Sequence, residues 1–203
     1  MSKSAYNHLL PVYPLIAQQI VDDYQITAGK CVDIGTGPGY LGIELAKITL
    51  LEMYFLDSDA ETLQKARENV RVNGLGNVVH FTHADVASLP FDDNFAELVI
   101  SRGSLWFWSD QIKGLQEIYR ILKPGGTAFV GGGLGRYTPP TMRRRLQGRG
   151  RKRLEKEGEG SFLKGAALEK LVRKTGIMCY RLIADEEGEP EHWIEIKKLY
   201  QEE

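Results

Sequence analysis

Along the chain, segments whose apolar residues recur at helical spacing are interspersed with short β-prone runs. Apolar side chains recur at helical spacing from Tyr13 to Tyr24, which predicts a leading helix that ends at Thr27-Ala28-Gly29. Five β-prone runs predict strands at 30–34, 53–57, 78–81, 98–101 and 127–130. Further helical patterns lie at 41–48, 63–73, 112–122 and 168–176. The chain therefore alternates between strand and helix over about 130 residues.

This alternation predicts an α/β fold with a doubly wound, mostly parallel sheet and helices on both faces. Two β-prone segments near the end, 177–184 and 193–197, flank the polar turn 185–189. They predict a C-terminal antiparallel hairpin that adds two strands at one edge of the sheet. In such sheets, ligands bind beyond the carboxyl ends of the strands.

Composition narrows the class of protein. The chain has 203 residues, of which 42% are hydrophobic and 26% charged, and we expect a single domain over 1–203. A net charge of -1 gives no general attraction to nucleic acid or membranes, and nothing indicates an oligomeric state. Cys31 and Cys179 lack the spacing of a metal site or a disulfide framework. Without a secretory pattern or a membrane-length apolar run, we expect a cytoplasmic protein.

Three glycines follow the first predicted strand directly, at Gly35, Gly37 and Gly39. Their spacing is G-x-G-x-G, because Tyr40 stands where a nicotinamide-binding fingerprint has its third glycine, so a pyrophosphate has less room. Asp33 precedes the turn, where a carboxylate repels phosphate and suits a ligand with an ammonium group. It could instead hold the turn by accepting backbone hydrogen bonds.

Acids also follow the next two predicted strands. Asp57 lies 22 residues after Gly35, a spacing that suits a grip on ribose hydroxyls. Asp85 can accept a hydrogen bond from an exocyclic amine such as that of adenine. Either acid could instead cap the helix or turn that follows it. Acids at three successive strand ends, with no lysine in the glycine turn, favour a cationic nucleoside such as S-adenosylmethionine (SAM) over ATP.

With these residues in place, the chain resembles the class I SAM-dependent methyltransferases, and among them the ubiquinone/menaquinone-type small-molecule methyltransferases. The resemblance runs from about residue 30 to 131 and is carried by four segments in a fixed order. They are Val32-Asp33-Ile34-Gly35-Thr36-Gly37-Pro38-Gly39, Phe55-Leu56-Asp57-Ser58-Asp59, His83 to Phe91, and Glu117 to Gly126.

The resemblance implies a seven-stranded Rossmann-like methyltransferase fold with SAM as the cofactor. It also implies that the glycine turn lies along SAM, with an acid at the ribose and another at the adenine. The residues concerned are Gly35, Thr36, Gly37, Gly39, Asp57, Ser58, Asp85 and Val86. The chain departs from the family at Ala96-Glu97, where Phe-Asp is usual, and after the fourth strand, so the acceptor stays open.

Candidate contacts to the cofactor (Ser101 and Arg102) and to the substrate (Tyr13, Trp106 and Phe107) lie after the fourth strand and in the N-terminal helical cap, 1–28. Ser101 and Arg102 are placed to touch the methionine part of SAM or the acceptor, although Arg102 could instead pair with a surface acid. Trp106 and Phe107 could line a sulfonium or substrate pocket, because aromatic faces attract cations, or could pack beneath the next helix. Tyr13 could face the active-site mouth or belong to the core.

A basic insertion at 134–160 follows the fifth strand and could act as a lid. Its positive charges could dock an anionic substrate or RNA. Acidic residues follow at once, and such a mixture is typical of a solvated, mobile helix. The basic residues are Arg143, Arg144, Arg145, Arg149, Arg151, Lys152 and Arg153.

The sequence thus favours a SAM-dependent methyltransferase that acts on a small molecule. In a displacement at a sulfonium, the protein mainly has to position the acceptor and the methyl group. This agrees with a sequence that has no Cys/His or Ser/His/Asp constellation, and the catalytic residue stays unassigned. Two alternatives remain: transfer of the aminocarboxypropyl group of SAM, and a non-catalytic SAM- or RNA-binding module that uses 143–153.

Overall fold

The computed structural model describes residues 7–147 and 163–200. This part of the chain holds seven strands, most of them separated by helices, and residues 140–147 are also helical. The other elements are η1 (Asn7–Val12), α1 (Tyr13–Tyr24), β1 (Lys30–Ile34), α2 (Tyr40–Lys47), β2 (Glu52–Asp57), α3 (Ala60–Asn73), β3 (Val79–His83), β4 (Ala96–Arg102), η2 (Leu105–Phe107), α4 (Gln111–Ile121), β5 (Leu122–Gly131), α6 (Ala166–Arg173), β6 (Tyr180–Ile183) and β7 (Trp193–Lys197).

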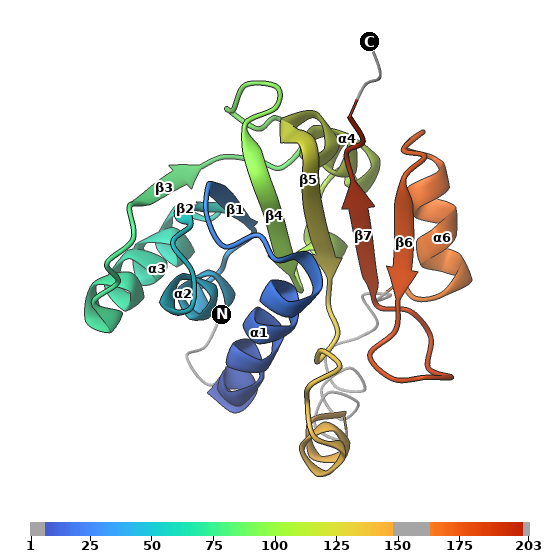
Figure 1. Ribbon diagram of the computed structural model, residues 1–203, viewed down its shortest axis with the longest axis horizontal. Helices are drawn as coiled ribbons and strands as arrows, with labels where there is room; N and C mark the ends of the chain where they lie inside the picture. Colours follow the sequence, from blue (N-terminus) through green and yellow to red (C-terminus); the bar gives the residue numbers. More distant parts are fainter. Residues whose placement is uncertain (1–6, 148–162, 201–203) are drawn as a thin grey trace.

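The strands form one sheet in the order β3-β2-β1-β4-β5-β7-β6. Neighbours from β3 to β5 pair in parallel, whereas β7 pairs antiparallel with both β5 and β6. The predicted Rossmann-like sheet with a C-terminal antiparallel hairpin is therefore confirmed (Figure 1). The chain runs outward from β1 to β3 and then returns to β4, so the strand order reverses between β1 and β4. Ligands bind sheets of this kind at such a switch point.

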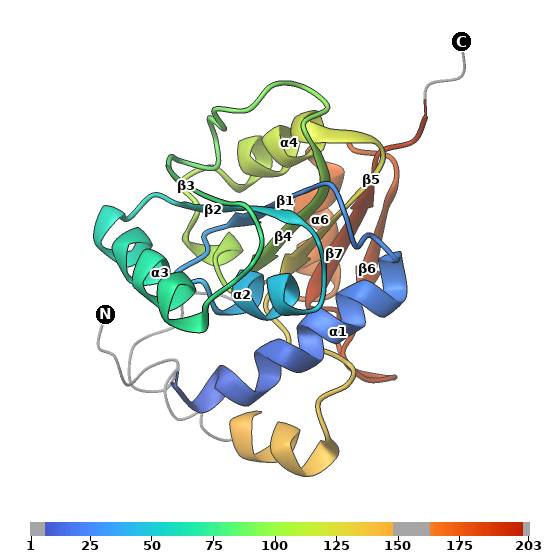
Figure 2. The same ribbon diagram turned by 60° about the vertical axis from the view of Figure 1, so that its left-hand side comes forward.

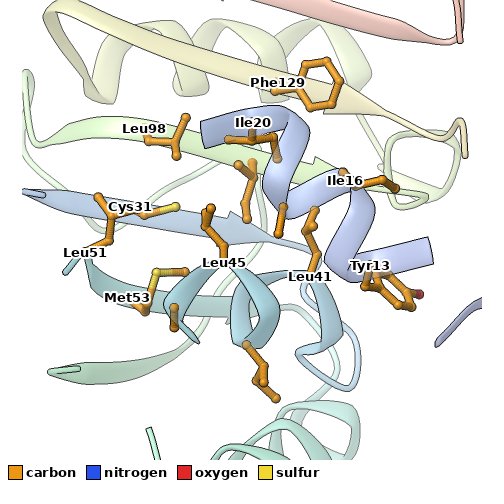
Figure 3. Packing of buried hydrophobic residues seen from close by; sticks show 14 of the residues in the cluster. Tyr13, Ile16, Ile20, Cys31, Leu41, Leu45, Leu51, Met53, Leu98 and Phe129 are labelled. Atoms are coloured by element: carbon orange, nitrogen blue, oxygen red, sulfur yellow. The ribbon is translucent and has the colours of Figure 1, made fainter. Parts of the chain in front are cut away.

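Helices cover both faces of the sheet, with α1, α2 and α3 on one face and α4 and α6 on the other (Figure 2). Alternate residues of a strand point to opposite faces. Cys31 accordingly packs with the first group of helices and Val32 with the second. Figure 3 shows side chains of α1 and α2, such as Ile16 and Leu45, meeting those of the strands.

One predicted boundary is wrong. The fifth strand is predicted at 127–130, but β5 begins at Leu122 and includes Lys123-Pro124-Gly125-Gly126. The helix does end before the proline, as predicted. The glycines then pair with the chain beyond β7, since Gly125 N donates to the Lys198 carbonyl over 2.7 Å and Lys198 N donates to Gly126 over 3.1 Å. A shift of register between Ala96 and Leu98 accommodates this irregular start.

None of the helices in the described ranges is long and apolar enough to cross a membrane.

Candidate functional site

The glycine turn joins β1 to α2 at the switch point of the sheet. Gly35, Gly37 and Gly39 all have positive φ, at 60°, 58° and 83°, which a residue with a side chain adopts only under strain. A side chain on Gly35 would collide with Ser104, whereas a Cβ on Gly37 would meet no atom within 4 Å. The backbone at Gly37 is therefore open to a ligand, and Gly35 is closed by the segment after β4.

Asp33 lies beneath the turn with 2% of its surface exposed. Its Oδ2 accepts hydrogen bonds from Thr36 Oγ1 over 2.6 Å and from Gly42 N over 3.2 Å. Burial raises the pKa of Asp33 to about 7, against the opposing effect of these two hydrogen bonds. Of the two roles expected for this acid, the structure shows the one that holds the turn.

Asp57 connects the end of β2 to the glycine turn. Its Oδ2 accepts from Gly37 N over 2.8 Å, and its Oδ1 accepts from Asp59 N over 3.0 Å. It does not cap α3, because that role belongs to Asp59, which accepts from the first backbone N–H groups of the helix. The neighbouring Ser58 is exposed, and its carbonyl lies 3.0 Å from His83 Nε2. The Asp57 carboxylate is thus fixed beside the open backbone of Gly37.

Asp85 and Val86 follow β3. Asp85 is exposed, and its Oδ1 accepts from Ala87 N over 2.7 Å, so it does hold the turn that follows it. Val86 is 6% exposed and packs into the core beside α4. The pair offers one carboxylate and one apolar surface.

The loop after Asp85 is clamped by an ion pair on α4, whose role the sequence did not predict. Glu117 Oε2 accepts from Leu89 N over 3.1 Å, and Arg120 donates to the carbonyls of Leu89 and Phe91 over 3.0 and 2.7 Å. The hydrogen bond from Arg120 lowers the pKa of Glu117 to about 2. The sequence did hold a signal for this ion pair: Arg120 stands three residues after Glu117, and Glu117 lies on the apolar side of the helix. Two of the four resemblance segments are thus in contact.

Ser101 turns inward at the end of β4. It is buried, and its Oγ lies 2.6 Å from Ser104 Oγ. Ser104 in turn donates to the Ile34 carbonyl over 3.2 Å and accepts from Trp108 Nε1 over 3.0 Å. Ser104, which the sequence did not single out, therefore ties the end of β4 to the end of β1.

Arg102 extends from β4 toward α1 and the segment after β5. Its Nε donates to the Gly133 carbonyl over 3.2 Å, and its Nη1 donates to Tyr13 Oη over 3.4 Å. Its guanidinium carbon lies 5.0 Å from the centre of the Tyr13 ring. Within 7–147 and 163–200, no carboxylate forms an ion pair with Arg102, so the expected alternative of a surface ion pair is not observed there.

The candidate aromatic residues have different environments. Tyr13 is 7% exposed and belongs to the core, which was one of its two expected roles, and its hydroxyl accepts from Arg102 (Figure 3). Trp106 is half-buried against Gly132, just beyond β5. Phe107 is 69% exposed. Trp106 therefore lies at the carboxyl end of the sheet, and Phe107 faces solvent.

The solvated position expected for Arg143 is wrong. Arg143 is 2% exposed, and its Nη1 pairs with Asp185 Oδ2 over 3.2 Å. Asp185, predicted in a polar turn, is buried because it neutralises this arginine. Arg144 and Arg145 are exposed, as expected, and 149–153 lie outside the described residues.

The carboxyl edge of the sheet is divided by charge. Acids follow β2 and β3, at Asp57 and Asp85, whereas Arg102 follows β4. The open backbone of Gly37 beside the Asp57 carboxylate fits a cationic nucleoside with ribose hydroxyls. Across the described ranges, no three His, Cys, Asp or Glu side chains are grouped as they would be to hold a metal ion.

Comparison with known proteins agrees with this geometry. A family model described as a methyltransferase domain matches residues 32–130. The rice (Oryza sativa subsp. japonica) 2-methyl-6-phytyl-1,4-hydroquinone methyltransferase 1, chloroplastic, is 34% identical over 102 residues, which are 50% of this chain and 30% of the rice protein. A ubiquinone/menaquinone biosynthesis C-methyltransferase from Vibrio campbellii is 29% identical over 103 residues, 50% of this chain and 40% of that protein. The chain thus spans less than half the length of these two relatives.

A solved structure matches nearly the whole chain. It comes from Methanococcus maripaludis and is described as a "putative S-adenosyl-L-methionine-dependent methyltransferase". It is 32% identical, the match covers 98% of this chain and 90% of that one, and the TM-score is 0.82. Together with the family model and the arrangement of the glycine turn, this places the chain in the class I SAM-dependent methyltransferases, whose cofactor is SAM.

Proposed function

We propose that this chain transfers the methyl group of SAM to a small-molecule acceptor. The observation that carries the proposal is the contact between Asp57 and Gly37 at the switch point of the sheet. In this contact the half-buried Asp57 carboxylate is fixed next to an open stretch of backbone, and the exposed acid Asp85 follows the neighbouring strand β3.

In this proposal, the turn from Gly35 to Gly39 lies along the cofactor and Asp57 accepts from the ribose hydroxyls, with Ser58 beside it. Asp85 accepts from the adenine amine while Val86 contacts the ring. Charge-assisted hydrogen bonds of this kind are stronger than neutral ones. The role of Asp33 is indirect, because its oxygen is occupied by Thr36 and Gly42.

Bound SAM supplies an activated methyl group on a sulfonium, so the protein chiefly has to align the acceptor and exclude water. Trp106, on η2 after β4, packs against Gly132 just beyond β5, where an acceptor that approaches the switch point from the β4–β5 side would meet it.

The printed names of the rice and Vibrio proteins point to hydroquinone and quinone precursors as their acceptors. Their matches cover half of this chain, and the family model ends at residue 130, before the 133–147 segment. The proposal therefore keeps to a small molecule and places hydroquinones among the first compounds to test.

The test has two stages. Calorimetry of the purified chain should show binding of SAM and of S-adenosylhomocysteine; a wild-type protein that binds neither would refute the proposal. Incubation with SAM and a panel of hydroquinones, phenols, thiols and carboxylic acids is then followed by mass spectrometry. S-adenosylhomocysteine as the spent cofactor supports methyl transfer, and methylthioadenosine would show aminocarboxypropyl transfer instead.

The alternative of an RNA-binding module loses support from Arg143, because its charge is neutralised in the interior by Asp185. A buried, paired arginine cannot contact a phosphate backbone.

A further inference from the structure

The guanidinium of Arg102 has unused hydrogen-bonding capacity. An arginine side chain carries five N–H donors. Nε uses its one donor on the Gly133 carbonyl, and Nη1 uses one on Tyr13 Oη. Within the described part of the chain, the remaining donors, including both on Nη2, have no protein acceptor. Both acceptors that are present are neutral, so neither balances the positive charge.

This lack of a counter-charge distinguishes Arg102 from Arg120 and Arg143, the half-buried and buried arginines elsewhere in the described ranges. Arg120 pairs with Glu117 and Asp93, and Arg143 pairs with Asp185. Arg102 is also partly buried, but its exposure to water is limited by Tyr13 and by the segment after β5. A partly desolvated charge without a partner is costly, and an anion that binds there recovers this cost.

Tyr13 sets the direction from which such an anion can approach. The guanidinium carbon lies over the Tyr13 ring at 5.0 Å from its centre, so the tyrosine limits access from its side. The bond from Nε to Gly133 fixes the inner edge. What remains is the outer edge, where paired N–H groups match the geometry of a carboxylate or phosphate.

The position of Arg102 relates this anion to the acceptor and not to the nucleoside. Asp57 and Asp85 lie beyond β2 and β3, on the half of the sheet where a cationic nucleoside fits. Arg102 is the last residue of β4, and it donates to the Gly133 carbonyl beyond β5, on the other half of the sheet, and to Tyr13 on α1. An anion held there would lie next to the nucleoside half of the site, in the part left for an acceptor that has to be aligned with the methyl group.

We propose that Arg102 binds an anionic group of the acceptor, a carboxylate or a phosphate, at the carboxyl edge of β4 and β5. This proposal rests on the proposed function, since it assigns the acceptor half of the same site. Tyr13 is the positioning residue for the guanidinium.

The experiment first establishes that wild-type protein binds S-adenosylhomocysteine, which tests the proposed function separately. The saturated complex is then titrated with benzoate, with its neutral counterpart benzamide and with inorganic phosphate, and binding is followed by calorimetry. Tighter binding of benzoate than of phosphate identifies a carboxylate site, and the reverse order identifies a phosphate site.

The decisive variant is Arg102→Gln, which keeps a donor and removes the charge. We expect it to weaken binding of the preferred anion at least tenfold and to leave benzamide and S-adenosylhomocysteine unchanged. Arg102→Lys should retain part of the anion binding if it folds as the wild type does. Arg67→Gln is the matched control, because Arg67 lies 4.4 Å from the Phe81 ring centre but on α3, away from β4. This control substitution should change the binding of neither benzoate nor phosphate.

Two results would overturn the proposal. One is equal binding of both anions to the wild type and to Arg102→Gln, provided that circular dichroism and the melting temperature show the variant folded. The other is a loss of S-adenosylhomocysteine affinity in Arg102→Gln that disappears with an analogue lacking the amino-acid carboxylate, because Arg102 would then serve the cofactor.

Discussion

Arg143 and Asp185 form an ion pair in the interior, with Nη1 and Oδ2 3.2 Å apart and only 2% and 4% of the two side chains exposed. Asp185 also accepts from Leu134 N, Gly135 N and Trp193 Nε1, over 2.6, 2.9 and 2.8 Å. One carboxylate thus joins the start of the insertion, the helix 140–147 and β7.

Breaking this ion pair should destabilise the fold. Arg143→Met keeps most of the side-chain volume but leaves Asp185 as a buried charge with neutral donors only, so we expect a loss of about 3 to 5 kcal/mol in the free energy of unfolding. Urea denaturation measures this loss. Arg144→Met, at the exposed neighbouring position, should stay within about 0.5 kcal/mol of the wild type. Equal effects of the two substitutions would show that the buried pair does not matter.

Asp57 should contribute to cofactor affinity. Asp57→Asn removes the charge while keeping an oxygen that can accept from Gly37 N, and it loses the bond that Oδ1 accepts from Asp59 N. We expect SAM to bind more weakly by about 1 to 3 kcal/mol, as measured by calorimetry. Asp92→Asn, an exposed acid in the loop before β4, serves as the control and should bind SAM as the wild type does. Unchanged affinity in Asp57→Asn would refute its assignment to the ribose.

Gly37 should tolerate no side chain, although there is space for one. Its φ of 58° costs alanine about 1 to 2 kcal/mol, and the new Cβ would occupy the open side of the turn. Gly37→Ala should therefore lower both stability and SAM affinity. Gly76→Ala is the matched control, because a Cβ there also meets nothing within 4 Å and no positive φ is present. If both variants bound SAM equally, the cofactor would not lie along Gly37.

The raised pKa of Asp33 predicts a pH dependence of stability. Its pKa is about 7 in the folded chain against an ordinary value of 3.8, so the folded state retains a proton that the unfolded state releases. Between about pH 4 and pH 7, stability from this group falls as the pH rises, by at most about 1.4 kcal/mol per pH unit. Asp33→Asn does not titrate, so the difference in unfolding free energy, wild type minus variant, should decrease over that range. A difference that stayed constant with pH would contradict the assignment.

Sequence patterns predicted most strands and helices because the signals are local. Each of these elements has its own periodicity of apolar residues and a glycine or proline near its end. The start of β5 was missed because its signal is not local. Pro124, Gly125 and Gly126 signal a break, and only pairing with the chain near Lys198, far along the sequence, makes them part of a strand.

The same distinction between local and distant signals holds for the charged residues. Asp57 could be recognised from its spacing after Gly35, because the contact joins two consecutive strand ends. Arg143 and Asp185 are 42 residues apart, and each stands among polar neighbours typical of the surface. No local pattern distinguishes such a pair from solvated charges until the fold brings the two together.

The place of β7 in the sheet has a further consequence. In the described part of the chain, β6 has β7 as its partner, and β7 alone connects it to β5 through the pairs from Thr127↔Lys197 to Gly131↔Trp193. If this one ladder opens, the hairpin leaves the sheet as a unit, while the five parallel strands keep their own hydrogen bonds. Opening of this one ladder would therefore release β6, β7 and the Asp185 loop between them, while Arg102 on β4 and the glycine turn after β1 stay in the paired part of the sheet.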